Sequence, residues 1–196
     1  MRTAWGYDVS GESIDPLMSV AEFNTITGNA YNGNPRIESA LKAASQVIRN
    51  YCGWHVCPSM QCTAHPKGDA VKRLPAAYVS AISSITENGT ELEATDYEWR
   101  EDGLIKRAGF SRWSDTWNAI EVEYTAGYAI GAVPDLAEAV AAIVAGVLSV
   151  SAGVASESAD GVSISYSASA SSIAASLTSQ VKSALNQYKV VSSHAA

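Results

Sequence analysis

The helical part of the fold rests on residues 34–53, which read NPRIESALKAASQVIRNYCG. The stretch opens with Asn34-Pro35, and a proline suits the first helical position because its missing N–H has no partner there. Apolar residues then recur at spacings of four and three, which puts them on one side of a helix. They are Ile37, Leu41, Ala44, Ile48 and Tyr51. Gly53 is the expected end, since glycine takes the left-handed conformation without strain.

Three further segments predict helices. Ser19 can cap a short helix over residues 20–27, with Gly28 as its end. Pro134-Asp135 begins a second long helix over 134–150, where the acid complements the helix dipole. The last helix is expected over 177–188, with its apolar stripe at Leu177, Val181, Ala184, Leu185 and Tyr188.

Between residues 56 and 128 the hydrophobic period changes to two, as in β-strands with one wet face. Ile120, Val122 and Tyr124 alternate with Glu121 and Glu123. Asn88-Gly89 predicts a tight hairpin turn, and Asp102-Gly103 predicts another. The sequence therefore predicts an α+β protein: a small helical bundle, with three main helices and a short N-terminal one, and an inserted antiparallel β element.

Composition limits the classes of function. The chain has 196 residues, 47% of them hydrophobic, with 13 basic and 20 acidic residues and a net charge of −7. Such a chain can bury a core, and its acidic balance disfavours duplex binding through phosphate neutralisation. Not one Lys or Arg occurs between Trp113 and Val181. The longest apolar stretch, 136–150, contains Glu138 and is short for a helix that crosses a bilayer. The N-terminus lacks the apolar run of a signal peptide. We therefore expect a soluble protein made inside the cell.

Residues 149–176 are unusually rich in two residue types, with 11 Ser and 7 Ala among 28 positions. Alone this composition is typical of a flexible linker. Val162, Ile164 and Tyr166 nevertheless alternate with serines, which favours a short strand or a strand-adding arm. We therefore divide the chain into an N-terminal arm (1–18), a helix–β–helix core (19–148), a Ser/Ala-rich arm (149–176) and a C-terminal helix with a tail (177–196).

Residues able to bind a metal or to catalyse a reaction are few. Five cysteine and histidine residues, both types that can bind a metal, lie within 14 residues: Cys52, His55, Cys57, Cys62 and His65. Their spacing does not match the paired knuckles of zinc sites, so we favour buried cysteines and surface histidines. No nucleophile elbow or phosphate-binding loop occurs, and we expect no enzyme activity, catalytic residue, metal or cofactor. Trp54, Trp99, Trp113 and Trp117 suit either the core or anchors of a protein interface, with the core favoured for each.

A series of motifs in order along the chain carries a family resemblance. They are Tyr51-Cys52-Gly53-Trp54, Leu74-Pro75, Asn88-Gly89, Tyr97-x-Trp99, Asp102-Gly103-Leu104-Ile105, Val122 to Tyr128, Pro134-Asp135-Leu136, Gly161 to Ser167, and Tyr188-Lys189. In this order, over about residues 19–190, the sequence resembles the head–tail connector proteins of tailed bacteriophages, also called adaptor or head-completion proteins. Ser179 follows Thr178 where the family often has proline, and residues 1–18 are an extension.

The resemblance implies a ring, typically of twelve subunits, that binds beneath the portal protein, extends the DNA channel and docks the next neck or tail component. DNA would pass through without sequence-specific binding, no membrane would be involved, and the protein would be made in the host cytoplasm and end in the virion at the head–tail junction. Contacts with the portal or a neighbouring subunit are expected at the arm and the C-terminal helix and tail: Val162, Ile164, Tyr166, Leu177, Val181, Leu185, Tyr188, Lys189, Val190 and Val191. Two alternatives stay open: another neck or tail-completion protein, such as a stopper or tail terminator, and a zinc-binding or enzymatic accessory protein.

Overall fold

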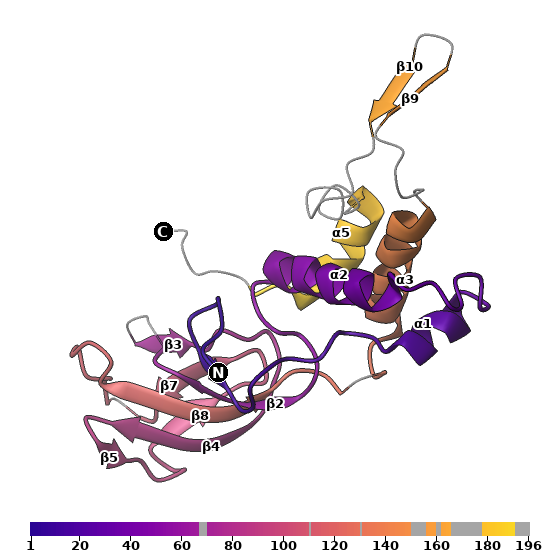
Figure 1. Cartoon of the computed structure of the whole chain (residues 1–196). Coiled ribbons are helices and arrows are strands. Elements are labelled where there is room, and N and C mark those ends of the chain that lie inside the picture. The colour runs from indigo at the N-terminus through magenta and orange to yellow at the C-terminus, as the bar shows by residue number, and fades with distance from the viewer. Residues whose placement is uncertain are drawn as a thin grey trace. The chain divides into compact units, whose positions relative to one another are not determined.

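The computed structural model describes residues 1–66, 70–109, 111–129, 131–149, 156–159, 162–165 and 178–190. The chain forms two compact units, each made of separate stretches of sequence (Figure 1). The sheet unit comprises Met1–Ile14, Cys52–Ile130 and Tyr188–Ala196. The helical unit comprises Asp15–Tyr51 and Gly131–Gln187.

The sheet unit contains a five-stranded antiparallel sheet in the order β1-β2-β8-β4-β5. Figure 1 labels β2, β8, β4 and β5 of this sheet. Its strands are β1 (Asp8–Val9), β2 (Met60–Ala64), β4 (Val79–Glu87), β5 (Thr90–Glu91) and β8 (Ile120–Ala126). The alternation in β8 is as predicted: Ile120, Val122 and Tyr124 are buried, whereas Glu121 and Glu123 are exposed. Strand β8 is central, so its buried side chains form the middle of this core.

A second, three-stranded sheet has the order β3-β7-β6 and is also antiparallel. It is built from β3 (Val71–Arg73), β6 (Tyr97–Trp99) and β7 (Leu104–Arg107). The predicted turn at Asn88-Gly89 joins β4 to β5, with both residues at positive φ, as a two-residue hairpin turn requires. The β part is thus two sheets, larger than the small inserted element that the sequence predicts.

The helical unit contains α1 (Val20–Ile26), α2 (Ile37–Cys52, whose last residue lies in the sheet unit), α3 (Pro134–Ser149) and α5 (Ser179–Leu185), followed by the 3₁₀ turn η1 (Asn186–Tyr188). The predicted cap of α1 is present: the Ser19 hydroxyl accepts from the Glu22 N–H, and the Glu22 carboxylate accepts from the Ser19 N–H. The stripe of α2 is buried at Ile37, Leu41, Ala44 and Ile48. Among the residues in the described ranges, no helix is long and apolar enough to cross a bilayer.

Two helix starts differ from the prediction. Helix α2 begins at Ile37 because Pro35 and Arg36 form a turn, in which the Asn34 carboxamide oxygen accepts from the Arg36 N–H at 2.9 Å. Helix α5 begins at Ser179, two residues after the expected Leu177, because the Thr178 hydroxyl accepts from the Val181 N–H at 3.3 Å and so caps the helix.

Residues 156–165 contain a separate hairpin of β9 (Ser156–Ala159) and β10 (Val162–Ser165). The expected short strand around Val162 and Ile164 is therefore β10, and it pairs antiparallel with β9 of the same chain.

Candidate functional site: a tail anchor, an exposed tryptophan and a polar sheet face

Four aromatic residues from distant parts of the chain form one cluster in the sheet unit. Tyr78 stacks on Tyr128 with 4.7 Å between ring centroids, and Tyr128 contacts Trp54 and Tyr188 at 6.1 and 5.6 Å. The Trp54 indole N–H donates to the Tyr188 carbonyl oxygen at 2.6 Å. Three motifs of the family resemblance, those at Trp54, Tyr128 and Tyr188, thus meet at one place.

This aromatic cluster fixes the start of the C-terminal tail. Tyr188 is buried at 6% exposure, and the Val190 N–H donates to the Cys52 carbonyl at 3.0 Å. Lys189, between them, is exposed. The tail therefore leaves the sheet unit from a defined point, with the Lys189 side chain toward solvent.

In the helical unit, α5 is held by its apolar stripe and by polar contacts near its end. Leu185 is fully buried, and Val181 is half-buried. The Tyr51 hydroxyl donates to the Asn186 carboxamide oxygen at 2.7 Å, and the Gln187 carboxamide donates to the Asp135 carboxylate. Leu185 thus stabilises the subunit itself.

The predicted contact residues are therefore distributed over several elements. Val162 and Ile164 lie in β10, Val181 and Leu185 in α5, Tyr188 in η1, and Lys189 and Val190 follow it. Tyr166, Leu177 and Val191 lie outside the described residues. Contact of these residues with a portal or a neighbour stays a prediction.

The N-terminal segment, expected as an arm, contains a strand and a buried tyrosine. Strand β1 pairs with β2, and Tyr7 has no exposed surface. The Tyr7 hydroxyl accepts from the His55 backbone N–H at 3.0 Å and lies 2.8 Å from His55 Nδ1. His55 Nε2 lies 3.0 Å from the Ala126 carbonyl, which can only accept, so Nε2 carries the proton and Nδ1 accepts from the Tyr7 O–H.

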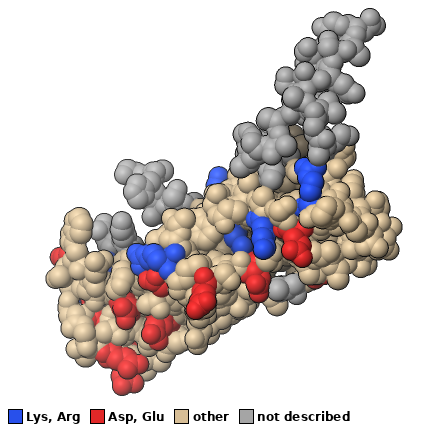
Figure 2. All heavy atoms as spheres, viewed as in Figure 1, with Lys and Arg blue, Asp and Glu red and all other residues tan. Residues whose placement is uncertain are grey.

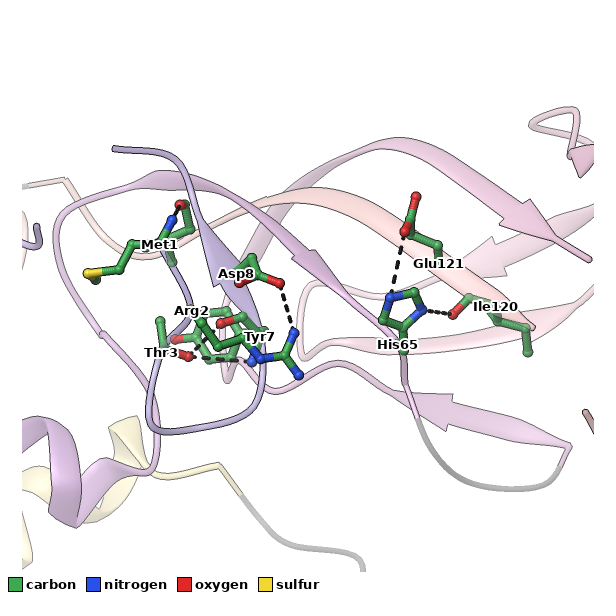
Figure 3. A network of polar contacts seen from close by, with 9 residues as sticks. Met1, Arg2, Thr3, Tyr7, Asp8, His65, Ile120 and Glu121 are labelled. Atoms are coloured by element: carbon green, nitrogen blue, oxygen red, sulfur yellow. Dashed lines mark hydrogen bonds and ion pairs between the residues drawn. The ribbon is translucent and has the colours of Figure 1, made fainter. Parts of the chain in front are cut away.

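Figure 3 shows how the first residues close around Tyr7. The Thr3 hydroxyl donates to the Tyr7 carbonyl at 2.7 Å, and the N-terminal ammonium of Met1 donates to the Val9 carbonyl at 2.7 Å. Arg2 and Asp8 form an ion pair at 2.8 Å. Strand β1 therefore has its outer edge covered by the chain's own first residues.

The Cys/His group does not converge on one point that could hold a metal. Within the described ranges, no group of three or more His, Cys, Asp or Glu side chains is arranged to hold an ion. All three cysteines are buried, as predicted, and burial raises the pKa of the Cys52 and Cys62 thiols to about 12. These two thiols therefore stay protonated near neutral pH, and a metal would have to displace both protons in order to bind them.

The histidines were expected on the surface, and for His55 this is wrong. His55 is fully buried because Tyr7 and Ala126 satisfy both of its ring nitrogens. His65 is half-buried: its Nδ1 lies 3.0 Å from the Ile120 carbonyl, and its Nε2 lies 3.6 Å from the Glu121 carboxylate (Figure 3).

Gly127 follows Ala126 at a place where no side chain fits. Its φ is +103°, and a Cβ there would lie 2.7 Å from His55 Nε2 and collide with the Pro58 carbonyl. The glycine of the Tyr-Thr-Ala-Gly-Tyr motif is thus required by the close approach of the His55 ring.

The tryptophans divide between core and surface. Trp54 and Trp113 are buried, Trp99 is half-buried, and Trp117 is 94% exposed. Trp117 lies in the loop between β7 and β8, which is fixed near its base: the Ser114 N–H donates to the Glu87 carboxylate at 2.6 Å, and Arg107 lies over the Trp113 ring. A fixed loop that exposes a tryptophan is typical of an interface anchor.

The solvent face of the five-stranded sheet is polar and acidic. Figure 2 shows acidic side chains in several places over the sheet unit. On β8, Glu121 and Glu123 occupy exposed positions. A shallow pocket of about 210 Å³ lies on this sheet, and its polar lining residues are Asp8, Ser10, Gln61, Thr63, Ser83 and Glu123. It is smaller than usual small-molecule sites, which are roughly 300–1,000 Å³.

Three comparisons with known proteins bear on the chain as a whole. The family model described as head completion protein matches residues 16–191. A chain in the solved neck of a native GTA particle, computed with C12 symmetry, is 17% identical with a TM-score of 0.59, and the match covers 94% of this chain and 96% of that one. A chain in the neck of an empty GTA particle, computed with C6 symmetry, is 22% identical with a TM-score of 0.53, covering 74% and 88%. A search of curated protein sequences returns no match.

Proposed function

Because this chain belongs to the head completion protein family, we propose that it is a structural subunit of the head–tail junction of a tailed phage or phage-like particle. Copies form a ring of about twelve beneath the portal protein. The ring extends the DNA channel and docks the next neck or tail protein. The protein is made in the host cytoplasm and ends in the virion.

The observation that carries this proposal is the family match over residues 16–191. The likeness to a neck chain supports it, since the match covers 94% of this chain and 96% of that one. The long helices α2 and α3 favour a connector over a stopper or tail terminator, which are β-rich.

The charge of the chain agrees with a channel through which DNA slides. A basic lining would bind phosphates and hold the duplex. The segment from Trp113 to Val181 has no basic residue and includes the acidic face of β8. Such a surface would repel DNA and leave it free to move.

We also propose that the protein catalyses no reaction. The buried thiols of Cys52 and Cys62 are protonated and therefore poor nucleophiles. Both ring nitrogens of buried His55 are engaged by Tyr7 and Ala126, which leaves the ring no free position to act as a base.

A truncation tests the proposal. A chain ending at Ser176 lacks α5 and the tail, and we expect particles made with it to contain filled heads without tails. A chain ending at Val190 is the control, because it keeps the Trp54–Tyr188 and Cys52–Val190 hydrogen bonds. Images of the capsid vertex should show a ring beneath the portal with the control; normal tailed, infectious particles from the shorter chain would contradict the assignment.

The shorter chain also loses buried Leu185, so a variant that spares the core is needed. Trp117→Ala should leave the free energy of unfolding within about 0.5 kcal/mol of wild type, because the side chain is almost fully exposed. If Trp117 anchors a neighbour or the next neck protein, the same variant should yield fewer tailed particles. Trp113→Ala is the contrast: removal of a buried indole should cost about 3–5 kcal/mol in urea unfolding.

A further inference from the structure

The β9–β10 hairpin is a sheet of two strands only, within the ranges that the structure describes. Its register pairs Ala159 with Val162, Ser158 with Ser163, Glu157 with Ile164 and Ser156 with Ser165. An isolated two-stranded hairpin is at best marginally stable in water. Pairing with a further strand would therefore stabilise the hairpin.

The register also shows which backbone groups face outward. In a hairpin closed by two residues, the pair next to the turn exchanges hydrogen bonds, and every second pair points its N–H and C=O away from the partner strand. Ala159 and Val162 are the pair next to the turn. The outward positions are therefore Ser156 and Ser158 on β9, and Ser163 and Ser165 on β10. All four are small and uncharged.

The other sheet edges carry features that discourage pairing with another chain. Strand β4 pairs with β5 only at Thr86 and Glu87, and over the rest of its length two irregularities in register interrupt its edge. Strand β1 has two residues and is covered through its bridge between Arg2 and Asp8. Strand β5 has two residues, one of them Glu91, and β6 has three, with Glu98 in the middle. Strand β3 has three and includes Lys72 and Arg73. Short strands and charges are the usual protection of edges. Strands β9 and β10 have four residues each, and their one charged residue, Glu157, is at a position whose backbone groups face the partner strand.

From these edges we propose that the β9–β10 hairpin is an assembly element whose partner is the same hairpin of a second copy of this chain. Strand β10 of one copy pairs with β9 of the next. Each added hairpin continues an antiparallel meander, so the contact is head-to-tail and closes when the copies form a ring. Closure leaves no free edge. The inference rests on the proposed ring and adds to it the surface that joins the copies at this arm.

Disulfide trapping tests the pairing with the full-length chain. One preparation carries Ser163→Cys, a second carries Ser158→Cys and a third carries Ser156→Cys, and each is assembled into particles alone or mixed with another. A disulfide requires Cα atoms within about 7 Å, so only neighbouring strands can form it. The native thiols are buried and interfere little. We expect a covalent dimer of the chain when Ser163→Cys is mixed with Ser158→Cys or with Ser156→Cys. No such dimer should form when any of the three variants is assembled alone.

The outcomes separate this inference from the proposed function. Complete particles without a dimer in either mixture would overturn the hairpin pairing and leave the head–tail function standing. A disulfide-linked product with the portal protein bearing an engineered cysteine, in place of the dimer, would assign the arm to a different partner and also overturn the pairing. A protein that never enters particles would remove both proposals.

Proline substitutions give a second readout. Ser163→Pro removes an outward N–H, so the hairpin can still form while its β10 edge can no longer donate to a neighbour. We expect loss of tailed particles with unchanged unfolding of the free subunit, while Ser163→Ala assembles as wild type. Normal assembly of Ser163→Pro would contradict the pairing.

Discussion

Tyr7 fixes the N-terminal segment to the sheet unit through one hydroxyl group. That hydroxyl accepts from the His55 backbone N–H and donates to His55 Nδ1, and both groups are buried. A buried polar group that loses its partner costs more than an average hydrogen bond contributes, because the group remains desolvated. The position of β1 therefore depends on a residue 48 places away in the sequence.

Tyr7→Phe should lower the free energy of unfolding by about 1–3 kcal/mol, since it leaves the His55 N–H and Nδ1 without the hydroxyl. Urea unfolding measures the change. Arg2→Ala is a control in the same segment: it removes an exposed ion pair with Asp8 and should cost less than about 1 kcal/mol. Equal effects of the two substitutions would mean that the hydroxyl has no special role.

The buried thiols give the protein a pH dependence on the alkaline side. Burial raises the pKa of the Cys52 and Cys62 thiols from an ordinary 9.0 to about 12. The unfolded chain therefore loses these protons at lower pH than the folded chain. Their contribution to stability is complete below about pH 9 and is lost as the pH rises from there to about 12.

We expect the free energy of unfolding to fall as the pH rises above about 9, and to fall less steeply in Cys62→Ala. Urea unfolding at several pH values measures both slopes. Burial also raises the pKa of Tyr124, so this residue lowers the free energy of unfolding further above about pH 10. Tyr124 is present in both wild type and Cys62→Ala, so its effect is the same in the two proteins. Identical slopes would show that the Cys62 thiol is not desolvated in the folded state.

At the scale of elements, α5 shows what a local sequence signal can and cannot locate. Its apolar stripe predicts a helix, and Leu185 and Tyr188 are indeed buried. Its start is misplaced because the hydrophobic spacing in the sequence extends back to Leu177. The Thr178 hydroxyl accepts from the Val181 N–H, so α5 begins at the next residue, Ser179.

Thr178→Ala should destabilise α5 by about 1 kcal/mol, because the Val181 N–H then has no side-chain acceptor. Hydrogen exchange of the amides in α5 should become faster. Ser179→Ala, one residue on and equally exposed, is the matched control and should exchange as wild type. Faster exchange in the control alone would place the cap at Ser179.

Strands β4, β7 and β8 could be predicted because they are long enough to alternate or follow a clear turn. Strand β1 could not be predicted, since it has only two residues and is stabilised by its pairing with β2 and by the Tyr7–His55 hydrogen bond. The same limit applies to the candidate site. In the sequence, Trp54, Tyr128 and Tyr188 belong to three separate motifs. Only the fold brings them into the aromatic cluster that anchors the tail.

At the scale of the molecule, the chain passes between its two units several times. The sheet unit takes residues from both termini and from the middle, so neither unit corresponds to one continuous stretch. A division of the chain into consecutive segments cannot show this, because it follows residue number and not contacts in space. The net charge, in contrast, is fully given by the sequence: −4 in the sheet unit, from 13 acidic and 9 basic residues, and −3 in the helical unit, from 7 and 4.

This charge makes a prediction about DNA. Affinity for duplex DNA comes mainly from cations that replace the counterions of phosphates, and both units of this protein are net negative. The purified protein should therefore not retain duplex DNA in a mobility-shift assay at about 0.15 M salt, and should gain little at about 0.05 M. Retention that weakens steeply with added salt would reveal a basic surface on the protein. It would contradict the proposed channel wall that repels DNA.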